Sequence, residues 1–297
     1  MNKGRRFASA ALFLPLFLLS GCGILWTTRR LPVPKPPSVV QTVSPDDLVA
    51  QLDRRWEALN SLYANVEIQA STLKKKEGVE KDYTTIPGLI LMRKPEMLRV
   101  YGRVPVIGSR MFDMVTDGKN VTLYIPSKDT AYKGTNTVHK KSVNPLENLR
   151  PGFFLDAMVV RGVEPDEDYM VTADSDTLED AKKKHLLLVP EYVLSVMRRK
   201  PGSRELTPMR VVTFHRDDLL PYQQDLYDSE GNLETEILYG PYENFRNIQY
   251  PSRITIKRPL EDYQVVMTID KVVENMPLHD DQFEIKLPEG TQIKQLK

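Results

Sequence analysis

Histidine, cysteine and acidic side chains are the residues through which this chain could perform catalysis or bind a metal, and the first two types are scarce. Among 297 residues there are one cysteine and four histidines. His215 and His279 each precede a run with aspartates, but solvated turns explain both runs more simply than a metal site does. The sequence contains no nucleophile elbow, zinc-protease, phosphate-loop or dinucleotide-binding motif. We therefore expect no catalytic residue, no metal, no cofactor and no enzymatic activity.

The single cysteine, Cys22, ends an N-terminal pattern that is typical of exported proteins. Three basic residues lie within positions 3–6, and an almost uniformly apolar run covers positions 7–19. That run is shorter than the ~20 residues of a membrane-spanning helix and matches the core of a signal peptide. Residues 19–22 resemble a bacterial lipobox, which implies removal of residues 1–21 and acylation of Cys22. The alternative is an ordinary secretory signal in which this thiol has no role.

Acyl chains, not charge, are expected to attach the mature protein to a membrane. Removal of residues 1–21 takes away three positive charges and changes the formal net charge from +1 to −2. One acyl chain binds a bilayer only marginally, whereas two or more anchor a protein stably. Gly23 follows the cysteine, and by resemblance to Gram-negative lipoproteins the absence of aspartate here implies an outer-membrane location facing the periplasm. The near-zero charge also argues against a nucleic-acid partner.

Residues 22–43 are predicted to carry the lipidated cysteine and a linker, and residues 44–297 to form one domain. Four prolines between positions 32 and 37 favour an extended polyproline conformation. Ser44 and Pro45 then provide the N-cap and the first position of a helix. Leu48, Leu52 and Trp56 follow at helical spacing and form an apolar stripe, which we expect to pack on the domain.

Most of the remaining chain alternates apolar and polar residues, as strands do. The segments 121–125, 253–257, 265–269 and 283–287 show this period of two, and turn residues such as Asp117-Gly118 separate similar runs. We predict roughly ten strands, joined by short turns and therefore antiparallel. The expected fold class is mainly β with helices (α+β), built on a large curved sheet or partial barrel.

The segment 144–159 breaks the strand pattern and predicts two short helical turns around Pro151. Its second half is apolar on nearly all sides. A helix of that kind needs apolar partners on two sides, or one such partner and a ligand. Two alternatives follow from the residues: the helix is buried in the core, or it forms a lid over a cavity.

Several segments, in order along the chain, resemble the LolA/LolB superfamily of periplasmic lipoprotein carriers and outer-membrane lipoprotein acceptors, and are closer to the acceptors. The resemblance covers most of residues 48–297 and consists of fold-level patterns, not catalytic motifs. Compared with typical acceptors, this chain has an additional charged stretch at positions 164–184. The similar segments are 56–62, 66–68, 93–100, 104–109, 112–125, 144–159, 227–231, 250–254 and 283–290.

The resemblance implies an unclosed antiparallel β-barrel, with helices covering its open side, around an apolar cavity for acyl chains. The implied function is that of a membrane-anchored envelope lipoprotein that binds acyl chains or lipoproteins and helps to deliver them to the outer membrane. A periplasmic carrier protein is a further implied partner, and we expect a monomer. The candidate cavity and lid residues are Leu98, Val100, Phe112, Met114, Phe153, Phe154, Leu155 and Met158.

A loop at Val106 and Ile107 carries the most specific hypothesis about a surface. The two apolar residues lie between Pro105 and Gly108 at a predicted hairpin tip, where exposure would lower solubility. The resemblance implies that they enter the bilayer or contact a partner protein. The alternative is that both side chains fold back onto the sheet.

Three classes of function remain open from the sequence. A lipid or lipoprotein carrier requires an apolar cavity large enough for an alkyl chain. A non-catalytic interaction module, such as an envelope stress sensor or an assembly factor, would have a filled interior and an exposed groove or edge. An enzyme with an unrecognised site would bring buried titratable groups together in one cleft.

Overall fold

The computed structural model of the protein describes residues 40–74, 79–136, 151–180 and 185–296. The chain forms two compact units, residues 37–176 with 189–297, and residues 1–36 with 177–188. The described part of the smaller unit is limited to residues 177–180 and 185–188, at the ends of two strands. Cys22, most of the predicted linker and the first half of the 144–159 segment lie outside the described residues.

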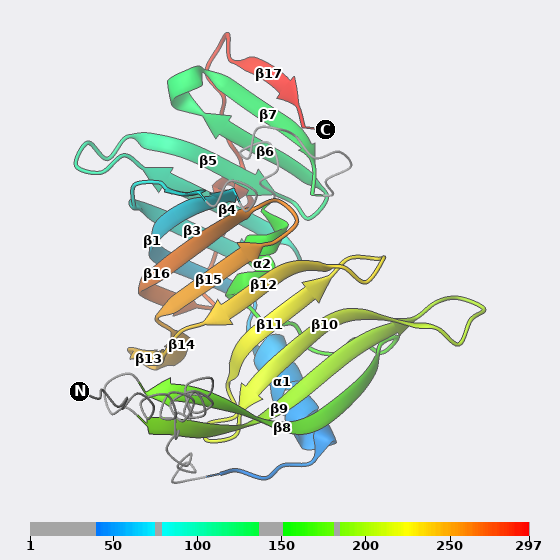
Figure 1. The fold of residues 1–297 in the computed structure, drawn as a ribbon. Helices are drawn as coiled ribbons and strands as arrows, with labels where there is room; N and C mark the ends of the chain where they lie inside the picture. Colours follow the sequence, from blue (N-terminus) through cyan, green and yellow to red (C-terminus); the bar gives the residue numbers. More distant parts are fainter. Residues whose placement is uncertain (1–39, 75–78, 137–150, 181–184, 297) are drawn as a thin grey trace, which may run out of the picture. The chain divides into compact units, whose positions relative to one another are not determined.

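One large sheet of 15 strands organises the structure, in the order β17-β7-β6-β5-β4-β3-β1-β16-β15-β12-β11-β10-β9-β8, with β2 paired to β1 (Figure 1). The strands β13 and β14 form a separate hairpin. Other described elements are the helices α1 (Pro45–Ala58) and α2 (Gly152–Met158) and the 3₁₀ turns η1 (Pro126–Lys128) and η3 (Asp280–Phe283). The strands are β1 (Ser61–Lys74), β2 (Val79–Asp82), β3 (Ile86–Arg93), β4 (Met97–Arg103), β5 (Arg110–Thr116), β6 (Asn120–Ile125), β7 (Thr130–Thr135), β8 (Asp168–Asp180), β9 (His185–Arg199), β10 (Leu206–His215), β11 (Pro221–Tyr227), β12 (Leu233–Tyr239), β13 (Tyr242–Phe245), β14 (Ile248–Pro251), β15 (Arg253–Arg258), β16 (Tyr263–Glu274) and β17 (Gln292–Gln295).

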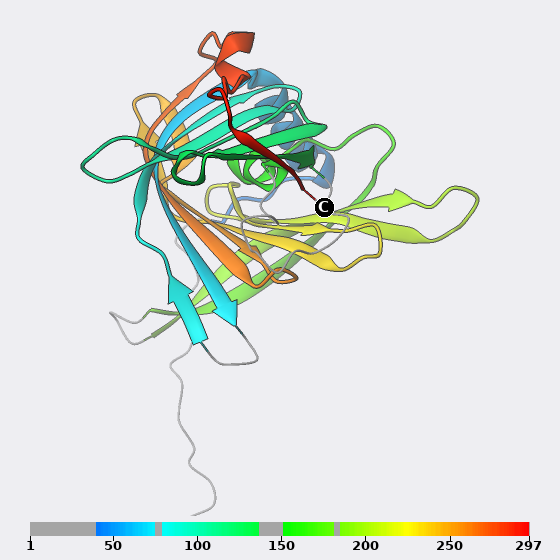
Figure 2. The same cartoon turned by 90° about the horizontal axis from the view of Figure 1, so that it is seen from above.

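The sheet is unclosed, since β17 and β8 end its strand order and do not pair with each other in the described part of the chain. Most neighbours follow one another in sequence through short turns and run antiparallel; β17 and β7 run parallel. In Figure 2, strands on both sides of α2 curve around this helix. The predicted class, mainly β with helices and a large open sheet, is confirmed. The strands outnumber the predicted roughly ten because several lack clean alternation.

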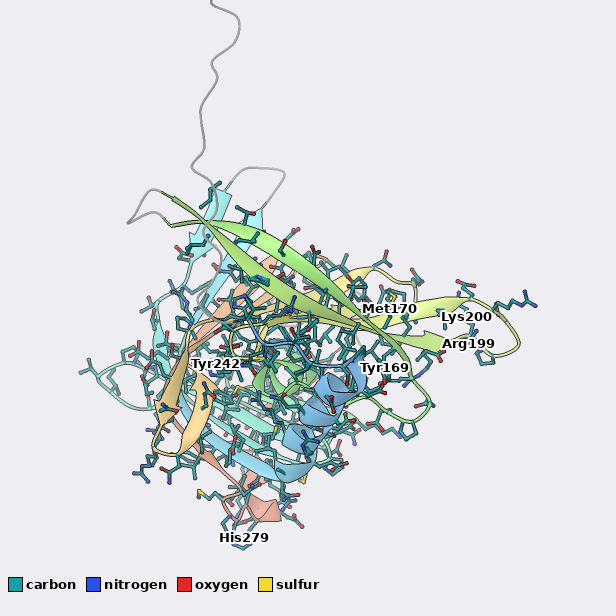
Figure 3. All side chains as sticks on the ribbon, turned by 90° about the horizontal axis from the view of Figure 1, so that it is seen from below. Tyr169, Met170, Arg199, Lys200, Tyr242 and His279 are labelled. Atoms are coloured by element: carbon teal, nitrogen blue, oxygen red, sulfur yellow. The ribbon has the colours of Figure 1, made fainter. Side chains whose placement is uncertain are left out.

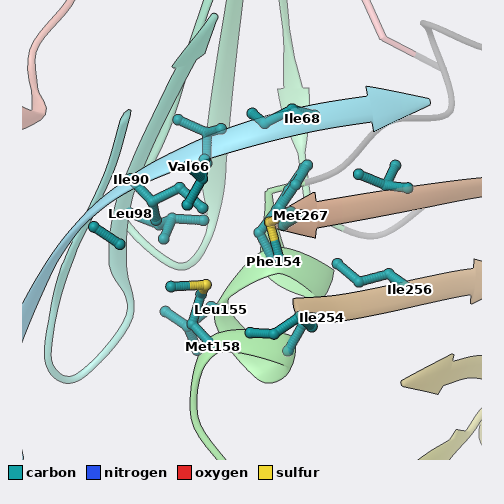
Figure 4. Packing of buried hydrophobic residues seen from close by; sticks show 14 of the residues in the cluster. Val66, Ile68, Ile90, Leu98, Phe154, Leu155, Met158, Ile254, Ile256 and Met267 are labelled. Carbon is teal, nitrogen blue, oxygen red and sulfur yellow. The ribbon is translucent and has the colours of Figure 1, made fainter. Parts of the chain in front are cut away.

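One face of the sheet forms the main core together with α2 (Figure 4). Val66 and Ile68 of β1 point to this face, as do Leu98 of β4 and Met267 of β16. Each is at most 6% exposed, as the period of two requires for a strand with one buried face. Phe154 of α2 lies among them, so the helix supplies apolar contacts that the unclosed sheet does not make with itself.

The strands β3 and β4 are buried on their other face as well. Leu89 and Leu91 pack there against Leu278 and Phe283 of the C-terminal segment around η3. The Arg99 guanidinium on the same face donates to the Gln282 carbonyl oxygen over 2.8 Å. Burial on both faces explains why β3 is apolar without alternation over residues 89–92.

The helix α1 begins and packs as the sequence predicts. The Ser44 hydroxyl accepts from the backbone N–H of Asp47 over 3.1 Å, and Pro45 occupies the first helical position. Leu48 and Leu52 pack against β9 and β10 in a second apolar cluster. Trp56 is half-buried instead of joining that cluster, and the Lys94 ammonium lies 3.8 Å from the centroid of its indole ring.

Candidate functional site

A cavity of about 420 Å³, here called the apolar cavity, lies on the core face of the sheet. Strands β1, β3, β5, β6 and β16 form its walls together with α2 and η1. Its volume falls within the range of small-molecule pockets, which are roughly 300–1,000 Å³. The lining residues are Ile68, Ala70, Ser71, Thr72, Tyr83, Thr84, Ile86, Met111, Phe112, Met114, Leu123, Ile125, Ser127, Lys128, Phe154, Tyr263 and Val265.

The lining of the apolar cavity is chemically simple. Aliphatic, aromatic and methionine side chains make up most of it, and several hydroxyl groups join them. Lys128 is the single charged residue in this lining, and it is solvent-exposed. Methionine adapts its shape to variable ligands, and Met111 and Met114 both line the cavity. Such a surface can bind a hydrocarbon chain and offers one cation to a negatively charged end group.

The structure brings all eight predicted cavity and lid residues together. Seven belong to the main core cluster, and Phe112 packs against it. Three of the eight, Phe112, Met114 and Phe154, line the apolar cavity itself. The remaining five are buried in the same core cluster and do not line this cavity; they are Leu98, Val100, Phe153, Leu155 and Met158.

The helix α2 is held in place by hydrogen bonds to its last carbonyl groups, and its two phenylalanine rings pack on each other. The rings of Phe153 and Phe154 stack with centroids 4.4 Å apart. The Tyr250 hydroxyl donates to the Met158 carbonyl oxygen over 2.6 Å, and the Gln224 amide donates to that of Asp156 over 3.0 Å. The helix is therefore buried in the core, which is the first of the two alternatives for this segment, and its Phe154 side chain also forms part of the cavity wall.

Sequence patterns pointed to β4, β5 and α2 but not to the part of the wall that β1 provides. Ile68 and Ala70 line the apolar cavity from β1, and Ile86 lines it from β3. The alternation of Val66, Ile68 and Ala70 was available as a signal. It could not be interpreted without knowing that β1 pairs with β16, which lies about 200 residues later in the chain.

The β4–β5 loop exposes both residues of the predicted apolar tip. Val106 is fully exposed and Ile107 is 77% exposed, so neither side chain folds back onto the sheet. The Ile107 N–H donates to the Pro105 carbonyl oxygen over 2.8 Å, which closes a γ-turn centred on Val106 at φ 69°. A β-branched residue rarely adopts a positive φ, because its side chain clashes with the backbone there. Figures 1 and 2 show this loop extending beyond the neighbouring strands.

A second cavity, here called the tyrosine cavity, measures about 360 Å³ and lies between α1 and the β13–β14 hairpin. Tyr239, Tyr242 and Tyr250 line it (Tyr242 is labelled in Figure 3). The Tyr239 hydroxyl is buried without a hydrogen-bond partner among the described residues, and burial raises the pKa of this tyrosine well above its usual value. Its rim is more polar than that of the apolar cavity and includes Gln51 and Glu274.

The two histidines near aspartates, His215 and His279, have different surroundings. His279 is exposed at the periphery of the larger unit (Figure 3). His215 stacks on Tyr222 with ring centroids 3.5 Å apart, and burial lowers the pKa of its imidazole. Over the described ranges, the structure contains no group of three or more potential metal ligands. It also contains no helix in those ranges that is long and apolar enough to span a membrane.

Solved structures with the same architecture give the class of this fold. A LolA superfamily protein from Nitrosomonas europaea matches with a TM-score of 0.50 and 14% identity, over 82% of this chain and 99% of that chain. A DUF1329 family protein from Desulfovibrio piger matches with a TM-score of 0.52 and 15% identity, over 80% and 95%. No protein-family model and no curated protein matches the sequence. The chain therefore has a LolA/LolB-like fold, as its sequence patterns predicted.

Proposed function

We propose that this protein is a membrane-anchored envelope lipoprotein that binds the acyl chains of lipids or lipoproteins and helps to deliver them to the outer membrane. The apolar cavity is the observation that carries the proposal. The cavity is an unfilled space on the core face of an open sheet, and this space could hold a ligand. A filled interior would have favoured an interaction module instead. In this proposal α2 covers the open side of the sheet and keeps the cavity dry.

The expected affinity is suited to transfer. Burial of each methylene group contributes about 0.8 kcal/mol, so ten of them would contribute about 8 kcal/mol. That free energy corresponds to a dissociation constant of about 1 μM before the entropic costs of association are subtracted. The entropic costs make the net affinity weaker than this limit, so the protein would hold an acyl chain moderately and release it to a bilayer.

One residue that lines the apolar cavity is close in sequence to the exposed loop. Met111 lines the apolar cavity, is 38% exposed, and follows Ile107 by four residues. A chain leaving the cavity beside Met111 would therefore emerge near the apolar tip. We propose that the tip contacts the membrane or a carrier protein during transfer.

The lipidated Cys22 and the linker complete the proposed mechanism. A polyproline segment spans about 3.1 Å per residue, so the linker could hold the sheet several tens of Å from the bilayer. This tether would keep the cavity at the periplasmic surface of the outer membrane and would let the tip reach that surface.

A titration with a fluorescent fatty acid tests the proposed function. The predicted mature chain, residues 22–297 with Cys22→Ser, is the appropriate protein, because it lacks both the lipid anchor and the apolar signal segment. Saturable binding of one fluorescent fatty acid per protein, displaced by palmitate, is the expected result. Absence of binding up to the solubility limit of the probe would contradict the carrier function and would favour the interaction module.

A further inference from the structure

The tyrosine cavity has its own lining and takes no part in the proposed function. It shares no lining residue with the apolar cavity; α2 contributes Met158 to the tyrosine cavity and Phe154 to the apolar cavity. Its volume of about 360 Å³ lies within the range of small-molecule pockets, roughly 300–1,000 Å³. The tyrosine cavity therefore has room for a small molecule that differs from the acyl chain of the proposed function.

Hydrogen bonds hold the walls of the tyrosine cavity in place. The Tyr242 hydroxyl of β13 donates to the Pro221 carbonyl oxygen over 2.7 Å, and the Tyr250 hydroxyl of β14 donates to the last carbonyl oxygen of α2 over 2.6 Å. The Asn275 amide donates over 2.9 Å to the Ala58 carbonyl oxygen at the end of α1. Because these walls are already ordered, a ligand that binds between them has little conformational entropy to remove.

Tyr239 is the tyrosine of this lining whose hydroxyl has no hydrogen-bond partner among the described residues. The residue is 6% exposed, and its hydroxyl oxygen is buried. Such a hydroxyl is unfavourable, because it has given up its bonds to water without replacing them. Burial also raises the pKa of Tyr239 well above its usual value, so the hydroxyl keeps its proton and can donate to a ligand. A bound molecule with an acceptor atom would remove this unfavourable feature.

The rest of the lining indicates an uncharged molecule with an aromatic body. Arg55 and Glu274 are the two charged residues of this lining, and they have opposite charges and are solvent-exposed. A charged ligand would therefore lose its hydration in the cavity without gaining a buried counter-ion. Trp56 and Phe214 line the cavity in addition to the three tyrosines, and aromatic side chains pack favourably on ring systems.

We infer that the tyrosine cavity binds an uncharged aromatic carbonyl compound, whose carbonyl oxygen accepts a hydrogen bond from the Tyr239 hydroxyl. In this site the aromatic side chains bind the ring system, and Tyr239 determines specificity. A hydrocarbon of the same shape would leave the buried hydroxyl unpaired, so the site distinguishes the two molecules by one hydrogen bond. The inference does not rest on the proposed function, because the acyl chain is assigned to the apolar cavity.

Titration of residues 22–297 carrying Cys22→Ser with prodan, a neutral fluorescent naphthyl ketone, tests the site. We expect saturable binding of one prodan per protein. Tyr239→Phe should weaken this binding about fivefold, the equivalent of one hydrogen bond between neutral groups. The emission of bound prodan should also move to shorter wavelength in this variant, because the ketone loses its hydrogen-bond donor. Tyr132→Phe, which removes the hydroxyl of a buried tyrosine outside both cavities, is the matched control and should bind prodan normally.

Two further measurements test the roles of the hydroxyl and of ligand charge. Tyr239→Phe should have an unfolding midpoint at or above that of the parent, because it removes a hydroxyl that has no partner in the fold. Naphthoate, an anion with the same ring system, should compete poorly with prodan. A lower midpoint of Tyr239→Phe would show that the hydroxyl serves the fold, and effective competition by naphthoate would show a site for anions. Either result would overturn the inference.

Absence of saturable prodan binding up to its solubility limit, or equal prodan affinities of Tyr239→Phe and Tyr132→Phe, would also overturn it. Ala70→Phe, which places a bulky ring in the apolar cavity, should bind prodan normally, and palmitate should not displace the probe. Displacement by palmitate would place the ketone in the apolar cavity and contradict a separate site. Fatty-acid binding should be intact in Tyr239→Phe, since Tyr239 does not line the apolar cavity. A protein that binds prodan and no fatty acid would support this site while contradicting the proposed function.

Discussion

At the residue scale, Val106 combines an unfavourable backbone with a fully exposed apolar side chain. Its φ of 69° belongs to the left-handed region, which costs of order 1–3 kcal/mol for a residue of this kind. Neither feature improves folding, so both indicate a role for the side chain outside the folded core. The neighbouring Gly108, at φ 73°, bears no such cost because it lacks a Cβ atom.

Replacing Val106 by glycine should separate stability from membrane contact. Val106→Gly relieves the strained φ, which offsets the entropic cost of a more flexible unfolded chain. We therefore expect a free energy of unfolding within about 1 kcal/mol of the parent and weaker vesicle binding. Chemical denaturation and flotation measure the two quantities. A large loss of stability would show that the Val106 side chain serves the fold.

A bulky residue at position 70 should block the apolar cavity. Ala70 lines it from β1, whereas Glu67 is exposed on the opposite face of the same strand. We expect Ala70→Phe to weaken fatty-acid binding at least about tenfold, the equivalent of 1.4 kcal/mol. Glu67→Phe is the matched control and should bind normally. Equal affinities of both variants would exclude this cavity as the binding site.

At the element scale, α2 is the part of the fold whose role depends most on tertiary context. Its sequence predicted an apolar helical turn, and the structure places Phe153, Phe154 and Leu155 in the core. The sequence could not distinguish burial from a lid, because that distinction depends on which distant strands surround the helix. The same limit applied to β3, where Leu89 and Leu91 face a C-terminal segment almost 200 residues away. By contrast, α1 was predictable from its local cap and apolar stripe.

Loosening α2 should accelerate exchange of the ligand. Tyr250→Phe leaves the buried Met158 carbonyl oxygen without its hydrogen bond, which costs about 1–3 kcal/mol. We expect a lower unfolding midpoint and faster dissociation of the fluorescent fatty acid in stopped-flow displacement. Tyr242→Phe removes a comparable hydrogen bond to the Pro221 carbonyl oxygen without touching α2. Identical dissociation rates in the two variants would argue against α2 as the cover.

At the scale of the whole molecule, the proposed mechanism joins a lipid tether, an open sheet and an exposed tip.

The fold class could be predicted from the alternation of residues and from short turns, because those signals are local. The volume of the apolar cavity could not be predicted, because it depends on the register of strands such as β1 and β16, including a bulge at Asn65/Val66. Only the packed structure shows that side chains leave space between Ile68 and Phe154.

Removal of the predicted acylation site should prevent processing and delivery to the outer membrane. Because Cys22 is acylated before residues 1–21 are removed, we expect Cys22→Ser to keep its apolar N-terminal run and to stay in the inner membrane without acylation. Fractionation of membranes on a density gradient, with metabolic labelling by an alkyne fatty acid, measures both location and acylation. Labelling of the serine variant, or its recovery in the outer membrane at the level of the parent, would contradict a role for Cys22.

Photo-crosslinking with a fatty acid that carries a diazirine at its methyl end tests the central claim most directly. The claim predicts that the label falls on peptides of β1, β5 and α2, close to Ala70, Met114 and Phe154, and that Ala70→Phe abolishes it. Label confined to surface peptides, or unchanged in Ala70→Phe, would contradict an acyl chain inside the sheet.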